Sequence, residues 1–330
     1  MIKKRREKTK RNETFLQKFA NIILTILFAV IISSQMCNAA NNNLRFTQIS
    51  DVHFSSYEDN TSYKFLKNSS ELLADVIFQI NTSGPYDFSI FTGDLVNKPK
   101  STELVKMIGI TSKINCPWYA INGNHDIAID GPLTKQEFVK ILNCHNRYMN
   151  IQKNYYAFTP KKGFRVICLD SVIDYKLTSN GEINCEQIEW LKKELDENKK
   201  NVVIIATHVP IEEPYPSSNH KMKNEDEIKD LLSNYSNPII VLQGHYHCVK
   251  AKQKNNIIYI SSPSLVTYPN AYRVININSN KKRTIVDIFL KETNLKDSQN
   301  RSKMRLFNIN SLYGNESDRN TTFEIKKDKE

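Results

Sequence analysis

Carboxylate, amide and imidazole side chains follow five separate apolar segments of this 330-residue chain. These side chains are the oxygen and nitrogen ligands that bind divalent metal ions. A single Asp-x-His or Gly-Asp pair is common by chance, so the significance lies in the repetition. The candidate ligands form five groups: Asp51-Val52-His53, Gly93-Asp94, Gly123-Asn124-His125-Asp126, His208 and Gly244-His245-Tyr246-His247.

The apolar segments that precede these groups predict buried strands. Val202–Ala206 and Ile239–Leu242 are continuous apolar runs, which is the pattern of strands buried on both faces. Stretches with helical spacing of apolar residues, such as Ser62–Asn81 and Cys185–Glu197, alternate with them. Strand-like runs after residue 250 suggest a second, partly antiparallel sheet. We therefore predict an α/β fold, a four-layer α/β/β/α sandwich of two mixed β-sheets flanked by helices.

The five groups are expected to meet in one crevice, because ligands of open α/β sheets bind outside the carboxyl ends of strands. His145 and His220 lie outside the groups and are predicted to be loop histidines. Carboxylates mixed with imidazoles suit Fe, Mn or Zn and disfavour Ca or a thiolate site. Seven candidate ligands are too many for one four-coordinate ion. They predict two divalent metal ions about 3.5–4 Å apart, which share a carboxylate and a hydroxide and hydrolyse a phosphate ester.

The motif order resembles that of the calcineurin-like metallophosphoesterase superfamily, which reads D-x-H, G-D, G-N-H-[DE], H and G-H-x-H. The resemblance covers roughly residues 44–290. It implies that His125 protonates the leaving oxygen or steadies the transition state, and that Asp126 orients His125. The metal ligands that it implies are Asp51, His53 and His247 for the first ion, Asn124, His208 and His245 for the second, and Asp94 between both.

The middle of the chain resembles the cyclic-nucleotide phosphodiesterase-like branch of this superfamily. The matching residues are Leu169-Asp170-Ser171, Gly181, Gln187, Trp190-Leu191, Ser261-Ser262-Pro263-Ser264-Leu265 and Tyr272-Arg273. One segment departs from the pattern, because Thr207-His208-Val209-Pro210 replaces the usual His-His-Pro. The resemblance implies a phosphodiester substrate, cyclic nucleotides among the candidates. Arg273 is either a phosphate contact or a solvent-facing residue at a strand edge.

Several alternatives stay open on the sequence alone. The same site could serve a phosphomonoesterase or a nucleotide pyrophosphatase. A nuclease would need a basic groove or an added DNA-binding domain, and no specific nucleic-acid partner is indicated. A non-catalytic interaction module is expected to lose ligands or the non-ligand histidine, and all are present here. The expected partner is a small phosphate-ester substrate.

The first forty residues have the pattern of a targeting segment. Eight lysines and arginines and two glutamates precede the apolar run Ile22–Ile32, so +6 of the formal charge of +11 lies there. An apolar run of this length fits a signal-peptide core, because a bilayer span needs about 20 residues. Residues 1–40 are thus predicted to be a signal peptide cleaved after Ala39 or Ala40, or an N-terminal anchor. Membrane contact is expected through residues 1–34, and the protein is expected to be exported.

The rest of the chain divides into a catalytic domain, residues 41–292, and a polar tail, residues 293–330. The tail has no long apolar run and is predicted to be disordered or loosely packed. Cys116 and Cys168 are expected to be buried and inert, and a disulfide between Cys144 and Cys185 is one alternative that the spacing leaves open.

Overall fold

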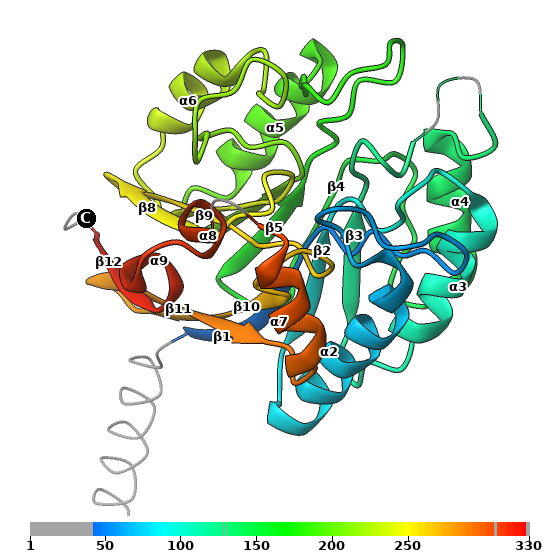
Figure 1. The fold of residues 1–330 in the computed structure, drawn as a ribbon. Coiled ribbons are helices and arrows are strands. Elements are labelled where there is room, and N and C mark those ends of the chain that lie inside the picture. The colour runs from blue at the N-terminus through cyan, green and yellow to red at the C-terminus, as the bar shows by residue number, and fades with distance from the viewer. Residues whose placement is uncertain (1–41, 128, 130, 307–308, 328–330) are drawn as a thin grey trace, which may run out of the picture. The chain divides into compact units, whose positions relative to one another are not determined.

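The computed structural model describes residues 42–127, 129, 131–306 and 309–327. The predicted targeting segment and its cleavage site lie outside the described residues. From Asn42 onward the chain forms one compact unit built on two six-stranded sheets (Figure 1). None of the helices in the described part of the chain has the length and apolar character needed to cross a bilayer.

The first sheet has the strand order β12-β11-β10-β1-β2-β3. β1, β2 and β3 are parallel, whereas β10, β11 and β12 continue the sheet in antiparallel fashion. The strands span Asn42–Ile49 (β1), Phe88–Thr92 (β2), Trp118–Ile121 (β3), Ala271–Ser279 (β10), Arg283–Glu292 (β11) and Thr321–Lys326 (β12).

The second sheet has the strand order β4-β5-β6-β7-β9-β8. β5, β6, β7 and β9 are parallel, and the two edge strands are antiparallel to their neighbours. The strands span Tyr156–Phe158 (β4), Phe164–Cys168 (β5), Val202–Thr207 (β6), Ile239–Gln243 (β7), Lys250–Lys254 (β8) and Ile257–Ser261 (β9).

Helices cover the outer face of each sheet. These helices are Ser69–Ser83 (α2), Ser101–Thr111 (α3), Lys135–His145 (α4), Cys185–Glu197 (α5) and Glu225–Ser233 (α6), with a 3-10 turn at Leu66–Asn68. Figure 1 shows α2, α3 and α4 on one side of the molecule and α5 and α6 on the other. α5 follows its predicted bounds, and the side chain of its N-cap Asn184 accepts a hydrogen bond from Gln187 N.

Three apolar layers hold the sheets and helices together. Phe46 and Ile204 belong to the layer between the sheets, Leu72 to the layer under α2 and α3, and Leu191 to the layer under α5. Every residue of β6 and β7 is buried, as expected for strands covered on both faces. The predicted four-layer α/β/β/α sandwich of two mixed sheets is confirmed.

The strands after residue 250 are divided between the sheets and do not form the second sheet by themselves. β8 and β9 join the sheet of β6 and β7, whereas β10 and β11 join the sheet of β1. The helix expected from Ser62 begins only at Ser69. The intervening chain instead pairs with a distant loop, because Phe65 N donates to Val266 O over 2.7 Å.

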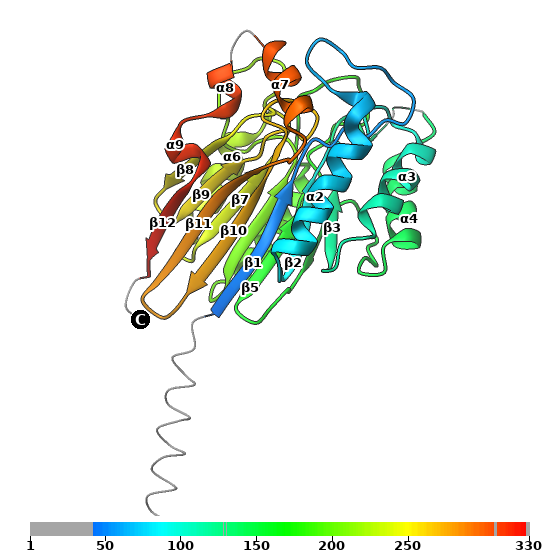
Figure 2. The same cartoon turned by 60° about the horizontal axis from the view of Figure 1, so that its bottom comes forward.

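The prediction of a disordered or loosely packed tail is wrong for its described residues. They form Lys296–Met304 (α7), Ile309–Tyr313 (α8), Glu316–Arg319 (α9) and β12, which pairs with β11. An edge strand needs apolar side chains on one face only, so the short alternation around Phe323 and Ile325 suffices. α7 and α8 lie at the same end of the molecule as the loop after β1 (Figure 2).

Arg273 anchors this C-terminal segment, and both sequence-based alternatives for it are wrong. Its guanidinium is buried and donates to the carbonyl oxygens of Asp318, Arg319, Lys250 and Ser261. Arginine suits this position because its donors are fixed in a planar fork that can reach several acceptors. It therefore joins β10 to α9 and to the ends of β8 and β9.

The described cysteines are all free thiols. Cys116 and Cys168 are buried, as predicted. Cys144 and Cys185 are exposed and are not joined, so the structure does not contain the disulfide that the spacing left open.

Candidate dinuclear metal site

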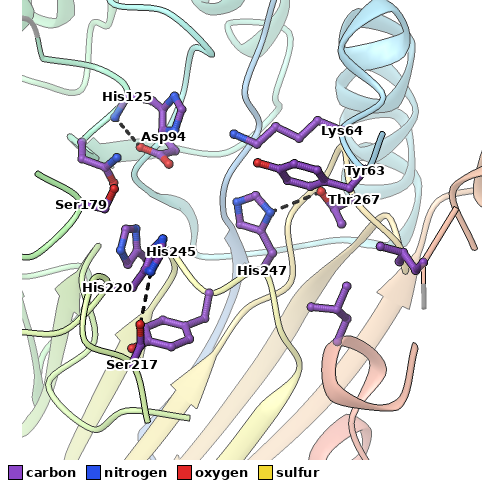
Figure 3. Close-up of a pocket in the computed structure, with 14 residues that line it drawn as sticks. Tyr63, Lys64, Asp94, His125, Ser179, Ser217, His220, His245, His247 and Thr267 are labelled. Atoms are coloured by element: carbon purple, nitrogen blue, oxygen red, sulfur yellow. Dashed lines mark hydrogen bonds between the residues drawn. The ribbon is translucent and has the colours of Figure 1, made fainter. Parts of the chain in front are cut away.

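The five predicted groups follow the carboxyl ends of five parallel strands. Asp51 and His53 follow β1, Asp94 follows β2, and His208 follows β6. Asn124 and His125 follow β3, and the two histidines of the last group follow β7. The carboxyl ends of both sheets meet at one edge of the sandwich, so these groups are brought to one site. Figure 3 shows Asp94, His125, His245 and His247 of this site around a common cavity.

The backbone at this site is locally strained. Five of the site residues have a positive φ: Asp51 (51°), His53 (42°), Asp94 (50°), His245 (71°) and His247 (52°). Such conformations are uncommon outside glycine and persist only where the surrounding structure imposes them. The rigid strands before each turn provide that constraint.

Two glycines allow the groups to approach one another. A Cβ atom on Gly93 would lie 2.4 Å from His208 Nδ1, and one on Gly123 would lie 2.2 Å from Asp94 Oδ1. Both distances are shorter than any normal contact. The glycines of Gly93-Asp94 and Gly123-Asn124 thus permit the close packing of His208 and Asp94.

One cluster of ligand atoms gathers around His53 and His247. His53 Nε2 lies 3.0 Å from His247 Nε2 and 3.5 Å from Asp94 Oδ2. His247 Nε2 lies 3.2 Å from Asp51 Oδ1. Two imidazole nitrogens and two carboxylate oxygens therefore converge on one point.

A second cluster gathers around His208. His208 Nε2 lies 3.3 Å from Asp94 Oδ1, 3.2 Å from Asn124 Oδ1 and 3.2 Å from His245 Nδ1. Asp94 thus presents one carboxylate oxygen to each cluster. The structure brings together all seven predicted ligands in the two predicted sets, and their role as ligands stays a prediction.

Hydrogen bonds to the far ring nitrogens orient the histidines. His208 Nδ1 lies 2.9 Å from Thr92 O, and His247 Nδ1 lies 3.3 Å from Thr267 Oγ1. An imidazole held in this way keeps Nε2 available for a cation. His53 is different, because its Nδ1 faces the amine of Lys64 at 3.3 Å.

The electrostatics of the site call for a positive charge next to Asp94. Burial raises the pKa of this carboxyl group, but the surrounding histidines, His208 first and then His125 and His53, together lower it to well below its usual value. For His208 the signs are reversed. Burial lowers its pKa, but the Asp94 carboxylate outweighs burial and raises the pKa to about 9. Burial and then the charge of His208 lower the pKa of His245 to about 3.

These observations fit a pair of divalent ions. A proton on His208 balances only one charge, while two carboxylates and the ring nitrogens of four histidines point at two centres. Carboxylate, amide and imidazole donors without a thiolate suit borderline divalent ions. Bound there, two ions neutralise phosphate charge and activate water.

The position of His125 fits its predicted role, whereas that of Asp126 does not. His125 Nδ1 lies 2.7 Å from Asn97 O, and its ring is edge-on to His53 with centroids 4.7 Å apart. The prediction that Asp126 orients His125 is wrong. The Asp126 carboxylate instead accepts hydrogen bonds from Gly123 N and Val96 N.

Asp126 therefore fixes the turn that carries His125. It is fully buried, and burial and then the charge of Asp94 raise its pKa to about 7. The carbonyl that orients His125 belongs to a loop 28 residues earlier in the chain. A motif read along the sequence cannot show such a partner.

A cavity of about 400 Å³ opens onto the clusters. Its lining includes residues that sequence analysis did not single out as part of the site: Tyr63, Lys64, Ser179, Ser217, His220, Thr267, Leu306 and Leu312. His220 was predicted to be an ordinary loop histidine, but its ring lies 5.1 Å from that of His245. In the sequence, only the fact that residue 220 is a histidine could have suggested a place in the site. The loops that carry the cavity-lining residues are far apart in sequence, so their proximity could not be predicted.

A family model described as calcineurin-like phosphoesterase matches residues 44–249. The chain belongs to this family. The resemblance predicted from the five motifs is confirmed, and as a calcineurin-like phosphoesterase the protein is a metal-dependent phosphoester hydrolase. The described site provides for two divalent metal ions.

Curated relatives and a solved structure agree with this placement. A probable cyclic nucleotide phosphodiesterase of Psychrobacter arcticus is 23% identical over 69% of this chain and 82% of its own. A probable glycerophosphodiester phosphodiesterase of Arcobacter nitrofigilis is 29% identical over 66% of this chain and 77% of its own. A dimetal phosphatase from Danio rerio has the same fold, with a TM-score of 0.57 at 14% identity, covering 76% of this chain and 99% of its own. The predicted class, a dinuclear metal-dependent phosphodiesterase, agrees with the family, with these relatives and with the clustered residues.

The metal content of variants should distinguish Asp94, which faces both clusters, from a ligand of one cluster such as His208. We expect about two ions per chain in the wild type, one in His208→Ala, and almost none in Asp94→Ala, because only Asp94 faces both clusters. Elemental analysis of the purified proteins measures this. His145→Ala and Asp59→Ala, both at exposed positions, should keep two ions. Two ions retained in His208→Ala would contradict the assignment.

His125→Ala should lose turnover without losing metal. A positioned acid contributes roughly 10²- to 10⁴-fold, so we expect a loss of that size with an alkyl diester. The loss should be smaller with bis-para-nitrophenyl phosphate, whose leaving group departs without a proton. Steady-state kinetics on both substrates, with metal content, test this. An equal loss on both, or loss of an ion, would show that His125 is not the acid.

Proposed function

We propose that the protein hydrolyses a 3′,5′-cyclic nucleotide to the corresponding nucleoside monophosphate. The observation that supports this is the mixed wall of the cavity. Aromatic Tyr63 and Tyr246 and aliphatic Leu306 and Leu312 lie around the same space as the metal clusters. A nucleobase can pack against such a wall, while Ser217 and other polar side chains can bind a ribose or a phosphate oxygen.

The C-terminal segment supplies part of this wall. Leu312 O accepts a hydrogen bond from Val249 N over 2.9 Å, and Arg305 Nη1 donates to Thr61 O over 2.8 Å. α7 and α8 are thereby fixed near the site, although they lie beyond the matched family residues. A glycerol head group would leave these leucines without a partner. The proposed substrate agrees with the name of the Psychrobacter relative.

The geometry of the site residues supports the roles that we propose for them. The seven clustered ligands hold the two ions, for which Fe, Mn and Zn are the candidates. The Asn97 carbonyl accepts the proton on His125 Nδ1, so Nε2 is the atom that passes a proton to the leaving 3′ oxygen. Asp126 keeps the turn in place and takes no part in proton transfer.

A substrate panel on the purified protein with added Mn²⁺ tests the proposal. We expect kcat/KM for cyclic AMP to exceed that for glycerophosphocholine at least tenfold, with para-nitrophenyl phosphate slower still. Leu312→Ala should raise KM for cyclic AMP, whereas Leu177→Ala, at a position 96% exposed, should not. Preference for glycerophosphocholine would favour the activity named for the Arcobacter relative. Preference for the monoester would contradict a phosphodiester substrate.

We also propose that the protein is exported. The support is the order of a basic stretch, an apolar run and small residues within the first forty positions. N-terminal sequencing of the protein from fractionated cells should find a chain that begins at Ala40 or Asn41, outside the cytoplasmic fraction. An intact N-terminus in the membrane fraction would support an anchor, and full-length protein in the cytoplasm would contradict export.

A further inference from the structure

Lys64 is a buried lysine that lines the catalytic cavity. Its exposed fraction is 6%, and it is the only lysine or arginine among the described residues of the cavity wall. Figure 3 shows its side chain extending past Tyr63 toward Asp94 and His125. Lysines are rarely buried without a charged partner, so the position needs a physical reason.

The backbone fixes Lys64 in this position. Lys64 N donates to Thr61 Oγ1, and Thr61 N donates to Lys64 O, both over 2.9 Å. The backbone N–H of its neighbour Phe65 donates a hydrogen bond to Val266 O. The amine also lies 5.8 Å from the centroid of the Tyr63 ring, within the range of a cation–π contact. The side chain is thus directed into the cavity by a closed loop.

Lys64 lacks a carboxylate partner in the described structure. The charges of Asp94, Asp51 and Glu58 act on it, but none forms an ion pair with it. Its hydrogen-bond partner there is His53 Nδ1, at 3.3 Å. This contact needs an imidazole that accepts through Nδ1.

His53 cannot accept at Nδ1 while it serves as a metal ligand. Its Nε2 is the atom that faces His247 and Asp94, so Nε2 is the ligand atom. A neutral imidazole that binds through Nε2 carries its proton on Nδ1, and an ammonium group has donors only. Two donors then face each other, and the amine must find an acceptor elsewhere in the cavity.

We propose that Lys64 binds a non-bridging phosphate oxygen of the substrate. This inference rests on the proposed phosphodiesterase function and adds a residue outside the seven ligands and His125. The amine lines the cavity beside the cluster around His53, where it can meet an anionic oxygen, and a charge-assisted hydrogen bond satisfies its donors. Binding of the ions and of the substrate is thereby linked through His53.

Lys64→Met should weaken phosphate binding and leave the metal in place. We expect at least tenfold increases in KM for bis-para-nitrophenyl phosphate and in the inhibition constant of inorganic phosphate, about 1.4 kcal/mol. Lys64→Arg, which keeps the charge, should recover part of both. Lys67→Met is the matched control, because Lys67 is three residues away and its side chain is 72% exposed.

The outcomes distinguish phosphate binding by Lys64 from a purely structural role in holding His53 in place. Unchanged KM and phosphate inhibition in Lys64→Met, or loss of an ion, would overturn the inference. A crystal structure of the full wild-type chain with inorganic phosphate tests it without a variant. The Lys64 amine should lie within hydrogen-bond distance of a phosphate oxygen, and an amine that stays on His53 would contradict it. A wild type without diester hydrolysis would refute the proposed function, whereas equal constants for wild type and Lys64→Met would refute this inference alone.

Discussion

The rest of the site depends on the contacts of the Asp94 carboxylate with both ligand clusters. This carboxylate is almost fully buried, and each of its oxygens faces a different cluster, one around His53 and one around His208. Burying a carboxylate is costly unless it is paired, so the position calls for positive charge close to Asp94. Because β2 delivers Asp94 from one sheet and β6 delivers His208 from the other, this requirement also joins the two sheets at their carboxyl ends.

The sandwich makes this arrangement possible because its buried strands hold the strained turns that follow them. Five site residues have left-handed backbone conformations, and each follows a strand that is largely or fully buried. Strain of this kind persists when the surrounding packing imposes it. Gly93 and Gly123 remove the side chains that would separate Asp94 from His208. The polar turns can therefore be arranged for chemistry because the apolar layers beneath them determine the fold.

The parts of the molecule that could be predicted from the sequence are those with a local signal. The buried strands and α5 follow from hydrophobic runs and periodicity, and the ligand groups follow from the residues at strand ends. The parts that could not be predicted depend on contacts between distant segments. Asp126 and His125 are adjacent in sequence, yet the partner of His125 is the Asn97 carbonyl. The roles of Lys64, of Arg273 and of the C-terminal helices likewise depend on loops that only the tertiary structure brings together.

Anomalous X-ray diffraction from crystals grown with Mn²⁺ can show whether two ions share Asp94. We expect two anomalous peaks, one among Asp51, His53, Asp94 and His247 and the other among Asp94, Asn124, His208 and His245. Their separation should be about 3.5–4 Å. A single peak, or two peaks of which one lies away from Asp94, would show that Asp94 does not join two ions.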